Sequence, residues 1–299
     1  MGDPLSADYG LTIRPARPDD RPAVERICAH TWEWGDYIPE VWDRWLADAN
    51  GQVLVGELAG QVVALSRIIF QPEGQVWLEG MRVAPEARRQ GIARQFLDYS
   101  LACARRCTAR VVRLSTGSYN EPVHRMAAHA GMVRVGAYVL WAADPLPQAP
   151  LPTILSPADA PQVQKVLAHS PLLVHTYGLC SFGWAWQELS PAYVACLLEA
   201  GQMAARLAPD GSLAALASIH PDPGDETLWI GFIEGQPGAV ADLATAIRGQ
   251  AAQIGSAKVQ VMLPGVDWLR DALGTAGYGP GDWQGELWVF ARRLSQEAK

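Results

Sequence analysis

The stretch "MRVAPEARRQGIARQF" (residues 81–96) combines a β-like run, a proline, three clustered arginines and one glycine directly before a helical pattern of apolar residues. A glycine turn from a strand into a helix leaves backbone N–H groups unpaired at the helix start. Together with the helix dipole, these groups attract phosphate oxygens. Arg88, Arg89 and Arg94 add positive charge around Gly91. Taken alone, the stretch fits a solvated basic turn equally well, so its meaning depends on the rest of the chain.

A second stretch, "FIEGQPGAVADLATAI" (232–247), has a similar shape but contains no arginine. The tryptophans and the proline of residues 32–39 recur in residues 184–191 at a constant offset of 152. Between the two copies, residues 142–157 contain five prolines, which is typical of a linker. The sequence therefore predicts a duplicated unit.

Each half shows the same order of elements: helix, hairpin, strand, helix, strand, helix, strand. Apolar residues at helical spacing indicate the helices, and alternating apolar residues indicate the strands. In the first half these elements are expected at residues 17–30, 51–70, 74–84, 93–106, 110–116, 122–131 and 134–142. The pattern predicts an α/β fold with α+β layering, in which each unit has a mixed, mostly antiparallel sheet flanked by helices.

The predicted domain bounds follow from the repeat and the linker. The first domain is expected at residues 11–143, the proline-rich linker at 144–157, and a second, degenerate domain at 158–294.

Composition excludes several classes of protein. The net charge of −7 argues against a nucleic-acid binder that works through bulk electrostatics. No apolar run is long enough for a membrane helix, and the N-terminus lacks a secretory pattern. Five cysteines without a Cys-x-x-Cys pair suggest neither a disulfide framework nor a zinc site. These features favour a cytoplasmic protein with no membrane, nucleic-acid or metal partner.

The charge is unevenly distributed. Residues 1–145 carry 16 arginines against 17 acidic residues, and residues 146–299 carry 8 basic against 14 acidic residues. Eight of the 16 arginines lie between Arg82 and Arg113. This concentration predicts a local anion site in the first half only.

Residues 88–93, "RRQGIA", fit the pattern Arg/Gln-x-x-Gly-x-Gly/Ala, and residues 120–132 fit a second pattern that begins with Asn120. Both patterns resemble those of the GCN5-related N-acetyltransferase (GNAT) family, which uses acetyl-coenzyme A and no metal. The resemblance implies that backbone groups of Met81 and Val83 hold the acetyl and pantetheine portions, while amides of residues 89–93 hold the pyrophosphate. The implied cofactor-binding residues are Met81, Arg82, Val83, Arg88, Arg89, Gln90, Gly91, Ile92, Ala93, Arg94 and Asn120.

The first half also resembles the histidine N-acetyltransferase group, which likewise carries two tandem units. The shared residues are Asp36, Tyr37, Pro39, Trp45, Leu46, Glu79, Gly80, Arg82, Val83, Ala84 and Pro85. This resemblance implies that the acceptor is a free amino acid, such as histidine, or a similar small amine. A monomer or a homodimer is expected.

Amide formation from a thioester requires the acceptor ammonium to lose a proton. Glu79 is the expected base, because period-2 alternation puts it on the same side of its strand as Met81 and Val83. The alternative is a purely structural ion pair between Glu79 and an arginine. Ala127 stands where the resemblance implies a proton-donating tyrosine. His124, Tyr119 or water could supply that proton instead.

The acceptor is expected near Trp34, Asp36 and Tyr37. The Trp-x-Trp pattern recurs in the second half, which favours a packing role for Trp34. Glu188 and Leu189 replace Asp36 and Tyr37 there, which favours these two as acceptor contacts.

In the second half, Pro237 stands in the corresponding loop and has no N–H to offer a phosphate. This half is therefore expected to be non-catalytic. The sequence predicts an acetyl-coenzyme A-dependent N-acetyltransferase that works by direct attack in a ternary complex. A non-catalytic acyl-coenzyme A-binding protein and a two-domain thiol-cofactor synthase remain alternatives.

Overall fold

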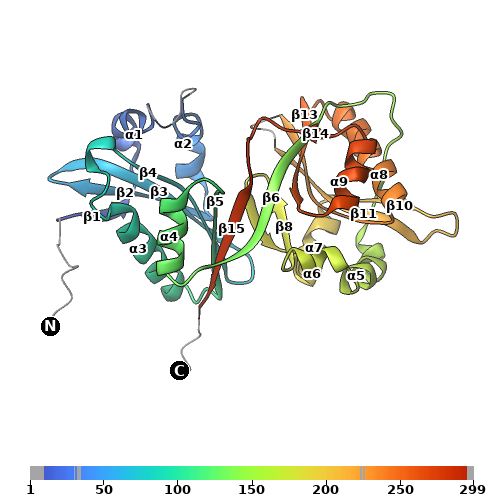
Figure 1. Cartoon of the computed structure of the whole chain (residues 1–299), viewed down its shortest axis with the longest axis horizontal. Helices are drawn as coiled ribbons and strands as arrows, with labels where there is room; N and C mark the ends of the chain where they lie inside the picture. The colour runs from blue at the N-terminus through green and yellow to red at the C-terminus, as the bar shows by residue number, and fades with distance from the viewer. Residues whose placement is uncertain (1–9, 30, 32–34, 223, 225, 295–299) are drawn as a thin grey trace. The chain divides into compact units, whose positions relative to one another are not determined.

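The computed structural model describes residues 10–29, 31, 35–222, 224 and 226–294. The chain forms two compact units (Figure 1). The first unit comprises the described parts of residues 1–115, 121–133 and 290–299, and the second comprises those of residues 116–120 and 134–289. In the described part of the chain, no helix is long and apolar enough to cross a membrane.

The first unit is a mixed sheet covered by helices on both faces. Helices α1 (Arg21–Cys28) and α2 (Ile38–Ala47) cover one face, and α3 (Ile92–Arg106) and α4 (Glu121–His129) cover the other (Figure 1). The strands from β1 to β4 pair antiparallel with one another, and β4 and β5 pair in parallel. Their order is β1 (Thr12–Pro15), β2 (Gly51–Leu58), β3 (Gln61–Gln71), β4 (Gln75–Val83), β5 (Val111–Gly117) and β15 (Leu287–Arg293).

Local sequence accounts for these elements. Ala59 and Gly60 both have positive φ (50° and 78°) in the turn between β2 and β3, as a two-residue hairpin with a type I′ turn requires. Gly131 (φ 69°) follows α4, and Met132 N donates to Ala127 O at 2.9 Å, which ends the helix in a left-handed cap. The seven elements expected in the first half are present, but the structure also has β1 before α1 and α2 between α1 and β2, which the sequence pattern did not predict.

The second unit repeats this plan. Its helices are α5 (Ala160–Ala168), α6 (Pro171–His175), α7 (Pro191–Glu199), α8 (Pro237–Gln253) and α9 (Asp267–Thr275). Its main strands follow the order β6 (Val133–Ala143), β13 (Lys258–Pro264), β12 (Thr227–Gly235), β11 (Leu213–Asp222), β10 (Met203–Leu207) and β7 (Thr153–Ile154). The short β14 (Gly279–Pro280) pairs with β6, and β8 (Leu179–Phe182) and β9 (Ala185–Glu188) form a separate hairpin. The predicted fold class, two tandem α/β units with mixed sheets, is confirmed.

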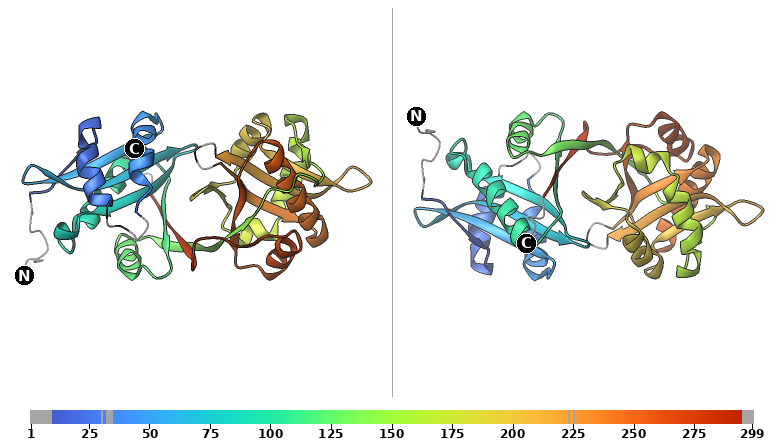
Figure 2. Two further views of the ribbon diagram at one scale, coloured as in Figure 1. Left: turned by 90° about the horizontal axis from the view of Figure 1, so that it is seen from above. Right: turned by 90° about the horizontal axis from the view of Figure 1, so that it is seen from below.

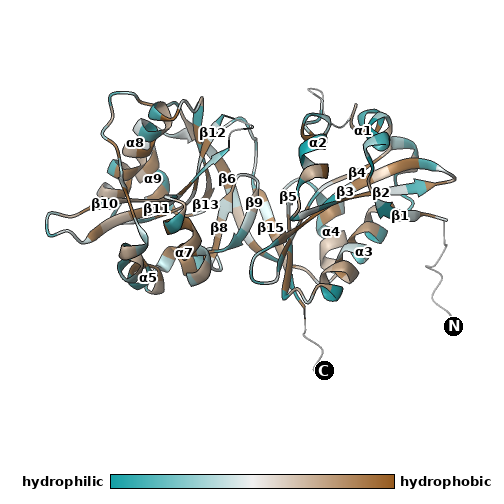
Figure 3. Cartoon of the chain, turned by 180° about the vertical axis from the view of Figure 1, so that it is seen from behind, coloured by the Kyte–Doolittle hydropathy of each residue, from teal (hydrophilic) through white to brown (hydrophobic). Residues whose placement is uncertain are grey.

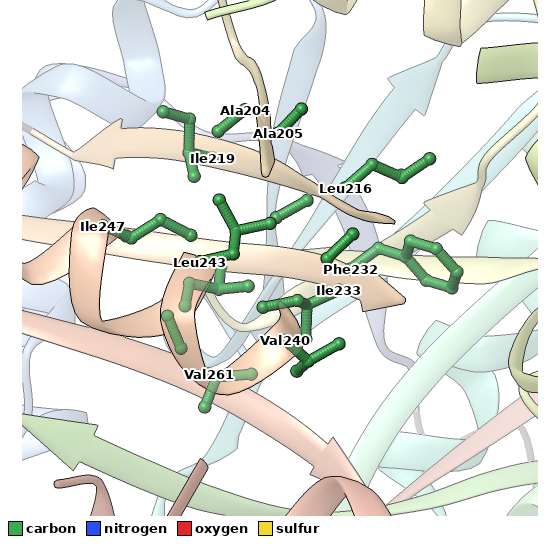
Figure 4. Close-up of a cluster of buried hydrophobic side chains, with 14 of the residues drawn as sticks. Ala204, Ala205, Leu216, Ile219, Phe232, Ile233, Val240, Leu243, Ile247 and Val261 are labelled. Atoms are coloured by element: carbon green, nitrogen blue, oxygen red, sulfur yellow. The ribbon is translucent and has the colours of Figure 1, made fainter. Parts of the chain in front are cut away.

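The core of the second unit forms where α8 packs on its sheet. Val240, Leu243 and Ile247 of α8 lie against residues of β11 and β12 such as Leu216 and Ile233, all nearly or fully buried (Figure 4). Burial of such side chains contributes about 1.5–3 kcal/mol each. Figure 3 shows the central strands of both units coloured mainly as hydrophobic.

The two units exchange their final strands. Residues 134–143 of β6 lie in the second unit, where Tyr138–Ala143 pair antiparallel with β13, although they follow α4 of the first unit in sequence. Conversely, the C-terminal residues of β15 belong to the first unit (Figure 2). Arg292 Nη1 donates to Ala130 O at 2.6 Å, and Leu294 N donates to Arg110 O at 2.9 Å. The two compact units therefore differ from the expected domains, residues 11–143 and 158–294, in the placement of these two strands.

A C-terminal truncation tests this exchange. A chain that ends at Val289 lacks Phe290, Arg292 and Leu294, so the first unit loses two buried apolar side chains and the hydrogen bonds to Ala130 and Arg110. Loss of one large buried side chain costs about 3–5 kcal/mol, so we expect the melting temperature of the first unit to fall by about 10 °C or more. The control ends at Leu294 and keeps these contacts. Equal melting curves and equal proteolysis patterns for the two truncations would contradict the exchange.

Candidate active site

Strands β4 and β5 part midway along their length. They pair in parallel only from Gln75 to Leu78 and from Val111 to Leu114, whereas β4 continues beside β3 as far as Val83. Ala84 N donates to Val63 O at 2.8 Å. Because alternate residues of a strand face alternate neighbours, the backbone groups of Val83 point away from β3, on the side of β4 where β5 has separated.

A β-bulge lies in this free part of β4. The register pairs Arg67 with Glu79 and Leu65 with Arg82, so Gly80 and the following residue together oppose one residue of β3. Gly80 has φ 68°, and a Cβ there would lie 2.7 Å from Cη2 of Trp45. Both the left-handed conformation and the tryptophan ring therefore require glycine at this position.

The bulge changes which way Glu79 faces. Paired residues of adjacent strands lie on the same face of a sheet, and residues three apart on a regular strand lie on opposite faces. Glu79 shares the face of Arg67 and Arg82, whereas Val83 shares that of Ala64. The expectation that Glu79 and Val83 point to the same side was wrong, because the extra residue interrupts the period-2 count.

Glu79 is held in an ion pair. Its Oε1 accepts a hydrogen bond from Arg67 Nη1 at 2.7 Å, and its side chain is 21% exposed. Arg67 also binds Asp48 and lies 5.0 Å from the centre of the Trp45 ring. Burial raises the pKa of Glu79 above its usual value, while the charge of Arg67 acts in the opposite direction. Glu79 therefore forms an ion pair with an arginine, and burial raises the pKa of its carboxyl group.

The expected acceptor residues have different surroundings. Trp34 lies outside the described residues. The Asp36 side chain is 0% exposed and binds Arg82, with Oδ2 at 2.6 Å from Nε. Tyr37 is 38% exposed, and its pKa is raised by burial of the hydroxyl and by the charge of Glu79. Tyr37 thus lies close enough to Glu79 for the charge of Glu79 to raise its pKa, while the Asp36 carboxylate faces Arg82.

The loop before α3 has the conformation of an anion cradle. Arg89 and Gly91 both have positive φ (62° and 75°), and Gly91 is the N-cap of α3. Gln95 N donates to Gly91 O at 3.0 Å, which makes this the first helical hydrogen bond. The N–H groups of the preceding residues therefore have no intrahelical acceptor. A Cβ on Gly91 would meet nothing within 4 Å, so the space over the loop is open.

An open groove of about 510 Å³ runs from this loop to α4. Seven of the expected cofactor-binding residues line it, namely Val83, Arg88, Arg89, Gly91, Ile92, Ala93 and Arg94. The other four expected residues, Met81, Arg82, Gln90 and Asn120, are not among the lining residues. The rest of the lining comes from Ala87, Pro122, Arg125, Met126 and His129.

Sequence reasoning missed the wall of the groove that α4 provides. Pro122, Arg125, Met126 and His129 occupy positions i, i+3, i+4 and i+7 of this helix, so they share one face. This spacing, with an arginine among the four residues, was the available signal. The groove thus has cationic side chains on both walls.

His124 and Asn120 do not line the groove. His124 lies on another side of α4, with its ring 5.5 Å from that of Phe290. Asn120 Nδ2 donates to Thr116 Oγ1 at 3.0 Å. Ala127 is fully buried, and the ring of Tyr119 stacks on that of Trp283. None of these contacts shows a proton donor at the groove.

The second unit has different residues at the corresponding positions. Gly231 stands where the first unit has Glu79, and Glu234 pairs with Leu216 as Arg82 pairs with Leu65. A Cβ on Gly231 would lie 2.2 Å from Ser181 O, so the backbone of β8 occupies the place of a side chain. Glu234 is nearly buried, and burial raises its pKa to about 7.

The strands β12 and β13 also part, after Ile230 and Val261. The cavity where they part has a volume of only about 20 Å³ and is lined by side chains of α6, α9 and β8, including Leu172, Leu269 and Leu179. Helix α8 begins at Pro237 after an extended Gln236, without a left-handed glycine at its N-cap. The described residues of the second unit thus supply neither a counterpart of Glu79 nor a comparable opening between these strands.

Comparison with known proteins agrees with this geometry. Residues 21–132 match the model of the Acetyltransferase (GNAT) family, and the chain therefore carries a GNAT acetyltransferase domain. The resemblance found in the two sequence patterns is confirmed.

Two similar sequences are histidine N-acetyltransferases. The chain is 30% identical over 109 residues to that of Oreochromis niloticus (36% of this chain and 32% of that protein). It is 30% identical over 91 residues to that of Scomber australasicus (30% of this chain and 27% of that protein). The chain thus matches about a third of the length of these relatives.

Solved structures share the fold of the whole chain. A GCN5-related N-acetyltransferase from Sphaerobacter thermophilus has a TM-score of 0.63 and 15% identity, covering 97% of this chain and 98% of that one. A tandem GNAT protein from the clavulanic acid biosynthesis pathway has a TM-score of 0.55 and 15% identity, covering 96% of this chain and 100% of that one. These likenesses establish the two-unit arrangement.

Proposed function

We propose that the protein is an acetyl-coenzyme A-dependent N-acetyltransferase that acts on a small-molecule amine by direct attack in a ternary complex. The observation that carries the proposal is the left-handed Gly91 at the start of α3, open to a groove with cationic walls, in a unit that also holds Glu79 beside a β-bulge.

The residues of the groove fit coenzyme A. The N–H groups at the start of α3 suit a pyrophosphate, since aligned donors at a helix N-terminus bind anions. Arg88, Arg89, Arg94 and Arg125 surround this position and oppose the negative charge of the phosphates. Backbone groups of Met81 and Val83 on β4 are proposed to hold the acyl and pantetheine portions. When bound, acetyl-coenzyme A supplies the thioester carbon.

Glu79 is proposed to accept the proton of the acceptor ammonium. A base works best when its pKa lies near the working pH, and burial moves the pKa of Glu79 in that direction. Its Oε1 accepts a hydrogen bond from Arg67 Nη1, and the charges of Arg67 and Arg44 oppose the effect of burial. Since a thiolate with the pKa of an ordinary thiol is a tolerable leaving group, the step does not require a protein acid.

A free amino acid such as histidine is the proposed class of acceptor. Two histidine N-acetyltransferases at 30% identity support it. The exposed aromatic ring of Tyr37 beside Glu79 offers a surface for an aromatic or imidazole side chain. The second unit is proposed to be non-catalytic, because Gly231 replaces the glutamate and β8 fills its place.

Substitution of Gly91 by glutamate tests the cradle. A carboxylate at this position repels phosphate, and like charges in contact cost several kcal/mol, so we expect kcat/KM for acetyl-coenzyme A to fall at least about a hundredfold. The measurement is thiol release from acetyl-coenzyme A with a panel of free amino acids and amines. Gly211→Glu is the matched control, since Gly211 also has positive φ (82°) and open space around it, but lies in the second unit.

Gly211→Glu should lose about as much thermal stability as Gly91→Glu but keep wild-type activity. Equal activity of both variants would contradict the cradle. No thiol release by the wild type with any acceptor, together with thermal stabilisation by coenzyme A, would favour an acyl-coenzyme A-binding protein without turnover.

The pH dependence tests Glu79. A base must be ionised, so kcat/KM should rise with pH through the pKa of Glu79, at a pH above that of an ordinary glutamate. Arg67→Gln removes the nearby charge that lowers this pKa, so the acidic limb of the profile should move to higher pH. Glu79→Gln should lower the rate about 10²–10⁴-fold and abolish this limb. Arg21→Gln breaks an ion pair with Asp43 elsewhere in the unit, and it should leave the acidic limb of the profile unchanged. An unchanged limb in Glu79→Gln would rule out this base.

A further inference from the structure

Asp36 and Arg82 form a buried ion pair beside the bulge. Asp36 Oδ2 lies 2.6 Å from Arg82 Nε, and Oδ1 lies 3.3 Å from Nη2. The Asp36 side chain is 0% exposed and that of Arg82 is 15% exposed. Two parallel hydrogen bonds between a carboxylate and a guanidinium fix both the position and the plane of the arginine.

The remaining contacts of the pair tie together two parts of the chain. Asp36 Oδ1 also accepts from Ile38 N at 3.2 Å, at the start of α2. On β4, Arg82 Nη1 donates to Met81 O at 3.2 Å. The pair thus connects the N-terminus of α2 to the peptide that directly follows Gly80. Because both oxygens of the Asp36 carboxylate accept these hydrogen bonds, Asp36 is not placed to bind an acceptor.

The pair also orients Tyr37. The Arg82 guanidinium carbon lies 5.8 Å from the centre of the Tyr37 ring, whose edge-on neighbour is Trp45 at 6.0 Å. Trp45 is the residue whose ring closes the space over Gly80. Tyr37, Arg82 and the bulge therefore form one packed assembly, and the pKa of Tyr37 responds to the charge of Glu79.

The second unit provides an internal comparison. Glu188 and Glu234 stand at the positions of Asp36 and Arg82, and two carboxyl groups cannot form this pair. The second unit nevertheless builds the same fold, with β11 and β12 in the corresponding register. The fold does not require the pair, which favours a role in the site that only the first unit has.

From these contacts we infer that Asp36 and Arg82 are a positioning pair for the acetyl transfer, an inference that rests on the proposed function. Arg82 holds the carbonyl of Met81, and with it the β4 backbone that faces the acyl group. The same guanidinium holds Tyr37 beside Glu79, where the acceptor amine is deprotonated. Neither Asp36 nor Arg82 contacts a substrate.

Arg82→Gln, Asp36→Asn and the double variant test this inference. A small displacement of reacting groups costs up to about a hundredfold in rate, so each single variant should lower kcat about 10–100-fold. The KM for acetyl-coenzyme A and the thermal stabilisation by coenzyme A should change less than about threefold, because the groove is intact. The double variant should be no slower than the worse single variant, since each substitution breaks the same interaction.

Arg14→Gln is the matched control. Arg14 forms an ion pair of similar burial in the same unit, with Asp20 at 2.7 Å and Glu57 at 2.6 Å, away from the bulge. This variant should lose thermal stability with kcat unchanged. Addition of guanidinium at millimolar concentration should partly restore kcat in Arg82→Ala and leave the kcat of Arg14→Ala unchanged.

Two results would overturn the inference. One is a kcat within twofold of the wild type in Arg82→Gln. The other is a loss of kcat in Arg82→Gln that Arg14→Gln reproduces at equal thermal stability. If the wild type binds coenzyme A but releases no thiol with any amine, both the proposed function and the positioning role are wrong. If the wild type is active and Arg82→Gln is equally active, only the positioning role is wrong.

Discussion

The left-handed conformation of Gly80 is the constraint on which the site depends. Trp45 leaves no room for a Cβ at this position, and the conformation itself disfavours other residues, so the bulge is fixed at one place in β4. The extra residue turns Glu79 and Arg82 toward the face covered by α1 and α2, while Val83 faces the side of α3. The proposed base and the backbone proposed to hold the acyl group therefore meet at the part of β4 from which β5 has separated. This geometry suits attack of an amine on a thioester.

The two units show what the fold needs and what the proposed chemistry needs. Both have the parted parallel strands and the long helix that follows, so these features belong to the fold. Among the described residues, only those of the first unit provide the left-handed glycine at the start of that helix, the glutamate beside the bulge and the Asp36–Arg82 pair. In the second unit the hairpin β8–β9 lies against Gly231, and Glu234 is nearly buried with a raised pKa. At these positions the residues of the second unit are packed, whereas the corresponding strands of the first unit border an open groove.

Sequence reasoning reached the elements that short-range patterns determine. The Ala59-Gly60 turn, the apolar face of α3 and the arginine loop before Gly91 all follow from local chemistry. Three features lay beyond it because they depend on contacts between distant residues. The bulge at Gly80 reversed the expected side of Glu79 relative to Val83, the partner of Asp36 is 46 residues away on β4, and β15 reaches the first unit from the end of the chain. The groove face of α4 was accessible in principle, since its residues follow helical spacing.

Calorimetric titration with coenzyme A measures whether the first unit alone binds the cofactor, as proposed. One molecule is expected to bind per chain, with an affinity that falls as salt concentration rises because arginines line the groove. Two equivalent sites per chain would show that the second unit also binds the cofactor. Absence of binding at millimolar coenzyme A would contradict the claim outright.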